Sequence, residues 1–204
     1  CPTDVYTLRT ALPPDLPVRV EGVVTAVRYA PGFPDTPTHV VIQVPVDAPE
    51  YRGPDDSGLW VFFGDAVGQC PPGCADVRVG DHLRVHGNAN LYVGQHQIHN
   101  VRALQRLEED QPLPPPVRVQ AFDVATGGPR AASLEGVTID LVGARVTDTQ
   151  PVAGAGDPLP LNEFVVDGAL RVNDFFGLLP QPSVGSTYTH LAGVLRLGNG
   201  DTKL

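Results

Sequence analysis

Apolar and polar side chains alternate along several segments in the first half of the chain, and this pattern predicts β-strands. In the first of these segments Val18, Val20 and Val24 occupy alternating positions, and Arg19 and Glu21 lie between them. A period of two places neighbouring side chains on opposite faces of a strand. The same pattern predicts five strands in this half, at residues 18–29, 39–44, 58–64, 81–92 and 95–107. The segments between them are rich in proline, glycine and aspartate, so we expect loops there, including residues 30–38.

The second half of the chain repeats features of the first. Residues 79–87, which read Val-Gly-Asp-x-Leu-x-Val-x-Gly, are echoed by residues 184–193, and a glycine follows seven residues later in both copies. A period near 106 residues is too long for a solenoid repeat and suits a duplicated small domain. The second set of predicted strands lies at residues 137–148, 163–167, 169–177 and 187–197, with a last strand from residue 202.

Composition along the chain divides it into four parts. Residues 1–17 are expected to form an N-terminal tether or short helix, and residues 18–107 the first barrel. Residues 108–116 are acidic and then proline-rich, with four prolines in the last five positions, which favours a stiff extended linker. Residues 117–204 would form the second barrel. Such a linker would hold the two domains apart or set them at a fixed angle.

The strand order and the repeated phrase resemble a known family of small barrels. Five strands with an irregular connection between the third and fourth are typical of the OB-fold. The phrase at 79–87, with Gly94 after it, resembles the fourth strand and hairpin of OB-fold domains attached to bacterial extracellular nucleases and found in exported bacterial lipoproteins. Gly22-Val23-Val24-Thr25 resembles their first strand. The resemblance implies an all-β chain of two tandem OB-fold-like five-stranded barrels joined by a proline-rich linker, and it is specific for fold rather than for activity.

The charge of the chain argues against a nucleic-acid partner. The net charge is −9, and residues 1–110 carry 8 basic and 14 acidic side chains while residues 111–204 carry 6 and 9. Neither half is basic, so binding to a polyphosphate would lack the counterion release that dominates such affinity. We therefore expect no binding to DNA or RNA.

The positions of the three cysteines indicate the cellular compartment in which the protein functions. A chain that begins at Cys1 resembles a mature bacterial lipoprotein, in which this sulfur is acylated and anchors the protein to the membrane; an arbitrary boundary is the alternative. Cys70 and Cys74 flank Pro-Pro-Gly, which can fold the loop back, so we expect a disulfide, with a metal site or free thiols as alternatives. These features predict an extracytoplasmic protein, either secreted or a lipoprotein of the outer membrane or cell surface.

The strands at 81–92 and 95–107 are predicted to form a hairpin that turns at Val93-Gly94. This register places Tyr92 opposite Gln95. One face is then polar and nearly uncharged, and it carries His82, His86, Asn88, Asn90, Tyr92, Gln95, Gln97 and His99. The opposite face, predicted to be core, carries Leu83, Val85, Ala89, Leu91 and Ile98. The candidate binding residues are His86, Asn88, Asn90, Tyr92, Gln97 and His99.

Three interpretations of this polar face remain open. It can be an ordinary solvated surface, or it can hydrogen-bond sugar hydroxyls or a peptide. A metal site formed by His82, His86 and His99 is the third interpretation. Residues four apart on a strand are roughly 13 Å apart, beyond one ion's ligand shell, so only His86 and His99 could share a metal.

Two further clusters have ordinary structural interpretations beside functional ones. The acidic loop with Asp47, Glu50, Asp55 and Asp56 could hold Ca²⁺ but lacks the EF-hand spacing and suits a solvated loop. The aromatic strand with Trp60, Phe62 and Phe63, and the equivalent Phe175-Phe176, could stack on bases or sugars, or could form core. Their alternation requires at least one ring of Trp60, Phe62 and Phe63 to face outward.

The sequence contains no nucleophile elbow, phosphate loop or zinc-protease motif. We therefore expect no enzymatic activity, no cofactor and no metal. The expected function is a non-catalytic exported binding or structural module, lipid-anchored in the envelope and contacting another envelope or extracellular protein. The alternatives are a carbohydrate-binding module and an accessory nucleic-acid-binding domain of an extracellular nuclease system.

Overall fold

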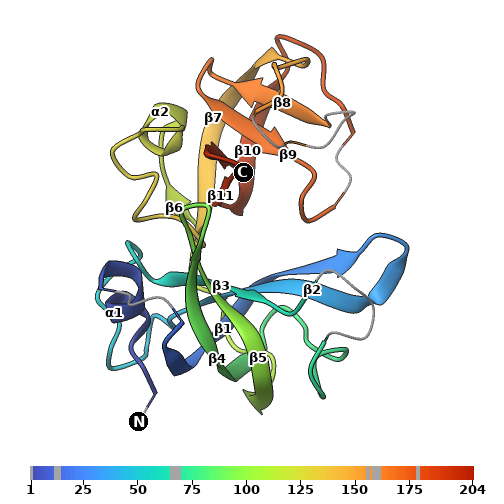
Figure 1. Cartoon of the computed structure of the whole chain (residues 1–204). Helices are drawn as coiled ribbons and strands as arrows, with labels where there is room; N and C mark the ends of the chain where they lie inside the picture. The colour runs from blue at the N-terminus through green and yellow to red at the C-terminus, as the bar shows by residue number, and fades with distance from the viewer. Residues whose placement is uncertain (1, 12–14, 65–69, 155–156, 158–161, 178–179) are drawn as a thin grey trace.

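The chain folds into two β-sheets, one for each half of the sequence. The computed structural model describes residues 2–11, 15–64, 70–154, 157, 162–177 and 180–204. Strands account for 48% of the chain and helices for 5%. The first half, blue to green in Figure 1, forms a five-stranded ring, and the second half, yellow to red, forms a curled half-barrel. None of the helices in the described part is long and apolar enough to cross a membrane.

The first sheet is a closed barrel with strand order β1-β2-β3-β5-β4. Its elements are α1 (Val5–Thr10), β1 (Pro17–Ala30), β2 (Phe33–Gln43), β3 (Gly58–Phe62), β4 (His82–Tyr92) and β5 (Gln95–Glu108). Only β3 and β5 pair in parallel; every other neighbouring pair in the ring is antiparallel. The inward-facing side chains, among them Val20, Ile42 and Leu83, fill the core.

The hairpin predicted from the alternation is confirmed in its register. Tyr92 lies opposite Gln95, Asn90 opposite Gln97, and Asn88 opposite His99. The turn residues Val93 and Gly94 both have positive φ, 49° and 88°, as the two-residue turn that matches strand twist requires. Beyond Asn100 the pairing shifts at a bulge, so that His86 lies opposite Ala103.

The second sheet follows the order β10-β7-β8-β9-β12-β11. Its elements are β6 (Val117–Arg118), α2 (Ala121–Val124), β7 (Thr138–Asp148), β8 (Glu163–Val166), β9 (Leu170–Asn173), β10 (Thr187–Val194), β11 (Arg196–Gly198) and β12 (Asp201–Lys203). β9 and β12 pair in parallel, as β3 and β5 do in the ring. The end strands β10 and β11 are consecutive in the chain and are separated only by Leu195, while β6 pairs with β7 outside this order.

Several boundaries differ from those expected. Residues 33–38, expected as loop, belong to β2; Pro37 is tolerated because it pairs with Tyr29 where the register of β1 and β2 shifts. The strand expected at 169–177 ends at Asn173, because Phe175 and Phe176 pack against the outer face of the ring instead of continuing the ladder.

The N-terminal residues, expected as a tether or short helix, form α1. Asp4 is its N-cap and accepts a hydrogen bond from the Tyr6 backbone N–H. Val5, Tyr6 and Leu8 are buried in the core of the ring. The segment is therefore an integral part of the first half.

The two halves contact each other through the outer face of the ring. Trp60 of β3 is fully buried, yet it points away from the ring's core, because its neighbours Leu59 and Val61 point inward. Its ring centroid lies 5.7 Å from that of Phe175 and 5.6 Å from that of Phe176. The second half thus covers a face that would otherwise expose tryptophan.

Candidate functional site

A cavity of about 350 Å³ lies where the outer face of the ring meets the second half. Its walls come from β1, β2, β3, the β4–β5 hairpin, the segment after β9, and β11. The lining residues are Arg28, His39, Phe62, Tyr92, Gln95, Gln97, Phe175 and Arg196. Cavities of this size accommodate small ligands.

A second cavity of about 630 Å³ adjoins the first and shares Arg28, Phe175 and Arg196 with it. It extends beneath the turn between β1 and β2, where Pro31 and Gly32 contribute to its wall. The three shared residues therefore form the partition between two hollows of one cleft.

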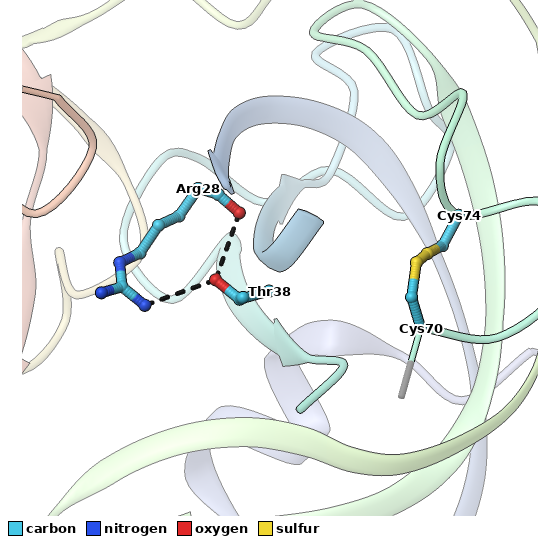
Figure 2. Close-up of a disulfide and its surroundings, with 4 residues drawn as sticks. All are labelled: Arg28, Thr38, Cys70 and Cys74. Carbon is cyan, nitrogen blue, oxygen red and sulfur yellow. Dashed lines mark hydrogen bonds between the residues drawn. A yellow bond between two sulfur atoms is a disulfide. The ribbon is translucent and has the colours of Figure 1, made fainter. Parts of the chain in front are cut away.

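Two arginines contact the same aromatic ring at this partition. The guanidinium carbon of Arg28 lies 4.4 Å from the centroid of Phe175, and that of Arg196 lies 4.0 Å from it. Arg28 Nε donates to the Phe175 carbonyl oxygen at 3.1 Å, and its Nη1 donates to Thr38 Oγ1 at 3.3 Å, the latter bond drawn in Figure 2. Cations over an aromatic face are stabilised by the ring quadrupole.

Arg196 is the more confined of the two cations. Its Nε is buried and has no hydrogen-bond partner among the described residues. Its guanidinium fills the space above Gly198, where a Cβ would lie 2.6 Å from Nη1. Burial, together with the charge of Arg28, lowers the pKa of Arg196 to about 10, so the group stays charged at neutral pH.

Among the described residues, the wall of the smaller cavity contains two titratable rings, those of His39 and Tyr92. Burial, and then the charges of Arg28 and Arg196, lower the pKa of His39 to about 3. Its Nδ1 lies 3.1 Å from Thr38 Oγ1, and its ring contacts Phe62 and Phe175. The imidazole is neutral at physiological pH and serves as a packing and hydrogen-bonding group.

The structure divides the predicted polar face between two places. Tyr92 and Gln97 line the cavity, together with Gln95. Asn88 and His99 instead contact Asp15, with 3.3 Å from Asn88 Nδ2 to the carbonyl oxygen and 3.0 Å from His99 Nε2 to Oδ1. 

The remaining two residues of the predicted face also lie outside the cavity. His86 borders a separate hollow of about 540 Å³ between Arg19 and Arg102. Asn90 is half-buried, opposite Gln97.

Two groups of residues in the β4–β5 hairpin differ from expectation in how far they are buried. Gln95 and Gln97, expected on an open surface, are each only 6% exposed because the second half lies over them. Leu91, expected in the core, is 53% exposed because the hairpin projects beyond the end of the barrel. Tyr92 and Val93 beside it are 62% and 56% exposed. The hairpin end therefore presents three exposed apolar side chains in succession.

The pattern analysis did not identify Arg28, His39 or Arg196 as site residues. Arg28 and His39 belong to long strands and pair directly with each other across β1 and β2. Arg196 comes from a strand far along the chain, 157 residues after His39 and 168 after Arg28. The only available signal was the outward-facing aromatic side chain required in β3, which indicates a covered face.

The other candidate clusters take part in contacts within the protein. Asp55 pairs with Arg130 and accepts a hydrogen bond from Ser133, while Asp56 lies 3.7 Å from Arg9. Phe63 belongs to the core of the ring. In the part of the chain that the structure describes, no three His, Cys, Asp or Glu side chains are grouped so as to hold a metal ion.

Figure 2 shows the side chains of Cys70 and Cys74 directed at each other. Their Cα atoms are 5.9 Å apart, a separation that a disulfide can span. Cys74 is fully buried against the core. Cys1 lies outside the described residues.

Comparison with known proteins leaves the site to be judged on its geometry. No protein-family model matches the chain, and a search of curated proteins finds no match.

Proposed function

We propose that the first half is an OB-fold barrel, that the second half is a shortened copy of it, and that the chain is a non-catalytic binding module. The strand order 1-2-3-5-4 with a parallel pair between strands 3 and 5 supports this assignment for the ring. The second half repeats the parallel pairing with β9 and β12. The same scheme would account for the sequence repeat.

The cavity occupies the face that OB-folds use for ligands. These folds bind along strands 2 and 3, between the loops that join strands 1 and 2 and strands 4 and 5. Here His39 comes from β2, Phe62 from β3, and Tyr92 from the end of the β4–β5 hairpin. This coincidence of a cavity with that face is the observation that carries the proposal. Because the second half covers the rest of the face, we infer a compact ligand instead of a polymer strand.

The chemistry of the walls supports binding without catalysis. Among the described residues, the walls of the smaller cavity carry no carboxylate, no thiol and no hydroxyl other than that of Tyr92. The one imidazole, His39, is neutral at neutral pH, so no imidazolium is present there to act as a general acid. Amides, aromatic rings and two cations remain, and these are groups that hold a ligand.

A screen by thermal unfolding tests this function. The probes are neutral monosaccharides, carboxylic acids, amino acids, inorganic phosphate and short peptides, each titrated against the whole chain. A ligand that binds only the folded state raises the midpoint with concentration. We expect at least one probe to do so in the wild-type protein.

Two variants of the same hairpin locate the binding. Gln97→Phe places a ring in the cavity, whereas Asn88→Phe makes the same change outside it. The shift should be lost in the first variant and kept in the second. No shift with any probe, or a shift that persists in Gln97→Phe, contradicts the proposal.

A second candidate function is contact with an envelope or extracellular protein at the hairpin end. The successive exposed side chains Leu91, Tyr92 and Val93 favour it, because exposed apolar groups gathered in one place mark interaction sites. A photo-crosslinking residue at position 91, in cells producing the protein, should give one discrete adduct. The same residue at the exposed position 152 should give none. Equal labelling from both positions contradicts this function.

We also propose that the chain is exported, on the strength of the cysteine pair. A disulfide between Cys70 and Cys74 would persist in an oxidising compartment and not in the cytosol. Thiol labelling of the native protein, before and after reduction, tests it. Labelling of both cysteines only after reduction supports export, and labelling before reduction contradicts it.

A further inference from the structure

We propose that the cleft binds a sugar, whose hydroxyl groups are recognised by the side-chain amides of Gln95 and Gln97. This inference rests on the proposed function, since it names the chemical class of the ligand. Both glutamines line the smaller cavity, and each is only 6% exposed. Neither side chain makes a hydrogen bond within the part of the chain that the structure describes. Because folded proteins seldom leave a buried amide without a partner, these two groups indicate a ligand that pairs with them.

The two amides are positioned to act on one ligand. Gln95 and Gln97 are two residues apart on β5, so their side chains share a face and their Cα atoms are about 7 Å apart. Their polar atoms are not among those that the protein encloses completely, so the amide groups open to the cavity. Each amide offers two N–H donors and one acceptor oxygen, and a hydroxyl both donates and accepts. Neighbouring hydroxyls of a sugar can therefore pair with both ends of each amide.

The larger cavity continues this amide-lined wall with Asn173 and Asn199. Asn173 Oδ1 accepts a hydrogen bond from the Phe175 backbone N–H at 3.2 Å, and Asn199 Nδ2 donates to Asp157 Oδ1 at 3.0 Å. Among the described residues, Asn173 Nδ2 and Asn199 Oδ1 have no partner. A ligand with hydroxyl groups around its whole ring can use the donors and acceptors of both hollows, whereas a ligand with a single polar group cannot.

Aromatic rings lie in the same wall as the amides. Phe62 and Tyr92 both line the smaller cavity, and Tyr92 lies at the exposed hairpin end, where it can contact a ligand that projects from the cavity. The face of an aromatic ring carries partial negative charge, and the C–H groups of a sugar, polarised by its oxygens, pack against such a face. A sugar has polar edges and apolar faces, so it matches a wall in which amides and aromatic rings are neighbours.

Isothermal titration of the whole chain tests the proposal. The probes are glucose, galactose, mannose and N-acetylglucosamine, and maltose and chitobiose represent the end of a glycan chain. Cyclohexanol, a ring of the same size with a single hydroxyl, is the control. We expect at least one sugar to bind at least tenfold more tightly than cyclohexanol. A disaccharide that binds more tightly than its monosaccharide identifies a glycan chain as the source of the sugar, and equal affinities identify a free sugar.

Two variants of β5 make the same change inside and outside the cavity. Gln97→Leu removes an amide from the cavity and should weaken the binding of the sugar at least tenfold. Gln105→Leu removes one at an exposed position that accepts a hydrogen bond from Arg84, and it should leave the affinity unchanged. Because an unpartnered amide contributes no hydrogen bond to the fold, Gln97→Leu should keep or raise the thermal midpoint of the free protein. A merely structural role of Gln97 would lower that midpoint.

Gln95→Leu should give the same two results, and it keeps the proposal testable if Gln97→Leu does not fold. Sugar binding no tighter than that of cyclohexanol overturns the sugar assignment. Unchanged sugar affinity in both leucine variants, or a lowered midpoint in both, does so as well. If a probe other than a sugar raises the unfolding midpoint and Gln97→Phe abolishes that shift, the proposed function stands and this inference alone fails; if no probe of any kind binds, both fail.

Discussion

His39 shows how one side chain links the packing of the two halves to pH. Its imidazole is enclosed by aromatic rings and lies near two arginines, so the protonated form is disfavoured in the folded protein. The unfolded chain exposes the ring to water, where the pKa is near its ordinary value of about 6.5. The unfolded state therefore binds an additional proton when the pH falls below that value.

We predict that His39→Phe flattens part of the pH dependence of stability. The folded pKa of about 3 lies below the unfolded one, so the stability associated with His39 is complete above pH 6.5 and is lost as the pH falls toward 3. Between pH 7 and pH 5 the loss should reach about 2 kcal/mol. Urea unfolding of both proteins at the two pH values measures it. An equal decrease in the wild type and the variant contradicts the account.

Arg9 anchors α1 to the second half. Its Nη1 lies 2.5 Å from Glu135 Oε2, and both side chains are buried. Nη1 also donates to His96 Nδ1, and Nη2 donates to the Ala132 carbonyl oxygen. Removing one partner leaves an uncompensated buried charge, which costs about 3–5 kcal/mol.

We therefore predict that Arg9→Met lowers the free energy of unfolding by that amount. The matched control is Arg52→Met, since Arg52 pairs with Asp4 on the surface, where such a pair contributes at most about 1 kcal/mol. Chemical denaturation of both variants makes the comparison. Similar losses in the two would show that the Arg9 pair is not buried as described.

At the scale of elements, the first residue of β3 packs directly against the segment that precedes β7. A Cβ on Gly58 would overlap the Gly136 carbonyl and lie 2.8 Å from the Val137 nitrogen, so only glycine fits. Gly58→Ala should force the backbones apart and cost roughly 1–3 kcal/mol or more. Gly177→Ala, where a Cβ meets nothing within 4 Å, should be nearly neutral. Thermal unfolding of the pair measures the difference, and equal midpoints would contradict the close approach.

Some elements could be predicted from the sequence alone, and others could not. The hairpin register followed from local alternation, because a strand slipped by one residue would expose its whole apolar face. The short helix α1 was one of two alternatives for the N-terminal residues, but its burial was not predicted, and the first residues of β2 were missed, because burial of α1 and the bulged pairing of Pro37 depend on tertiary contacts. For the same reason only Tyr92 and Gln97 of the cavity were among the six proposed residues: Arg28, His39 and Arg196 converge through the packing of the two halves, which no local pattern encodes.

At the scale of the whole molecule, the two halves share an apolar contact centred on Trp60. This is the chain's single tryptophan, and it contacts Phe175 and Phe176 of the second half. Its fluorescence therefore reports on the contact between the halves, while far-ultraviolet circular dichroism reports on both sheets.

We predict that the two signals change together in urea, as expected for one cooperative unit. Ile139→Val, in the core of the second half and outside the cluster around Trp60, should move both transitions equally. A fluorescence change that precedes the loss of β-structure would mean that the halves separate before they unfold.

The central claim is that the cavity between the halves is a ligand site, and side-chain amide NMR tests it most directly. The protein, labelled with nitrogen-15, is titrated with the probe that raises its unfolding midpoint most. The account predicts that the side-chain amide signals of Gln95 and Gln97 shift with saturation, while that of Asn88, which faces Asp15 outside the cavity, stays in place. Unmoved signals from Gln95 and Gln97, or a larger shift at Asn88, would place the ligand elsewhere and contradict the account.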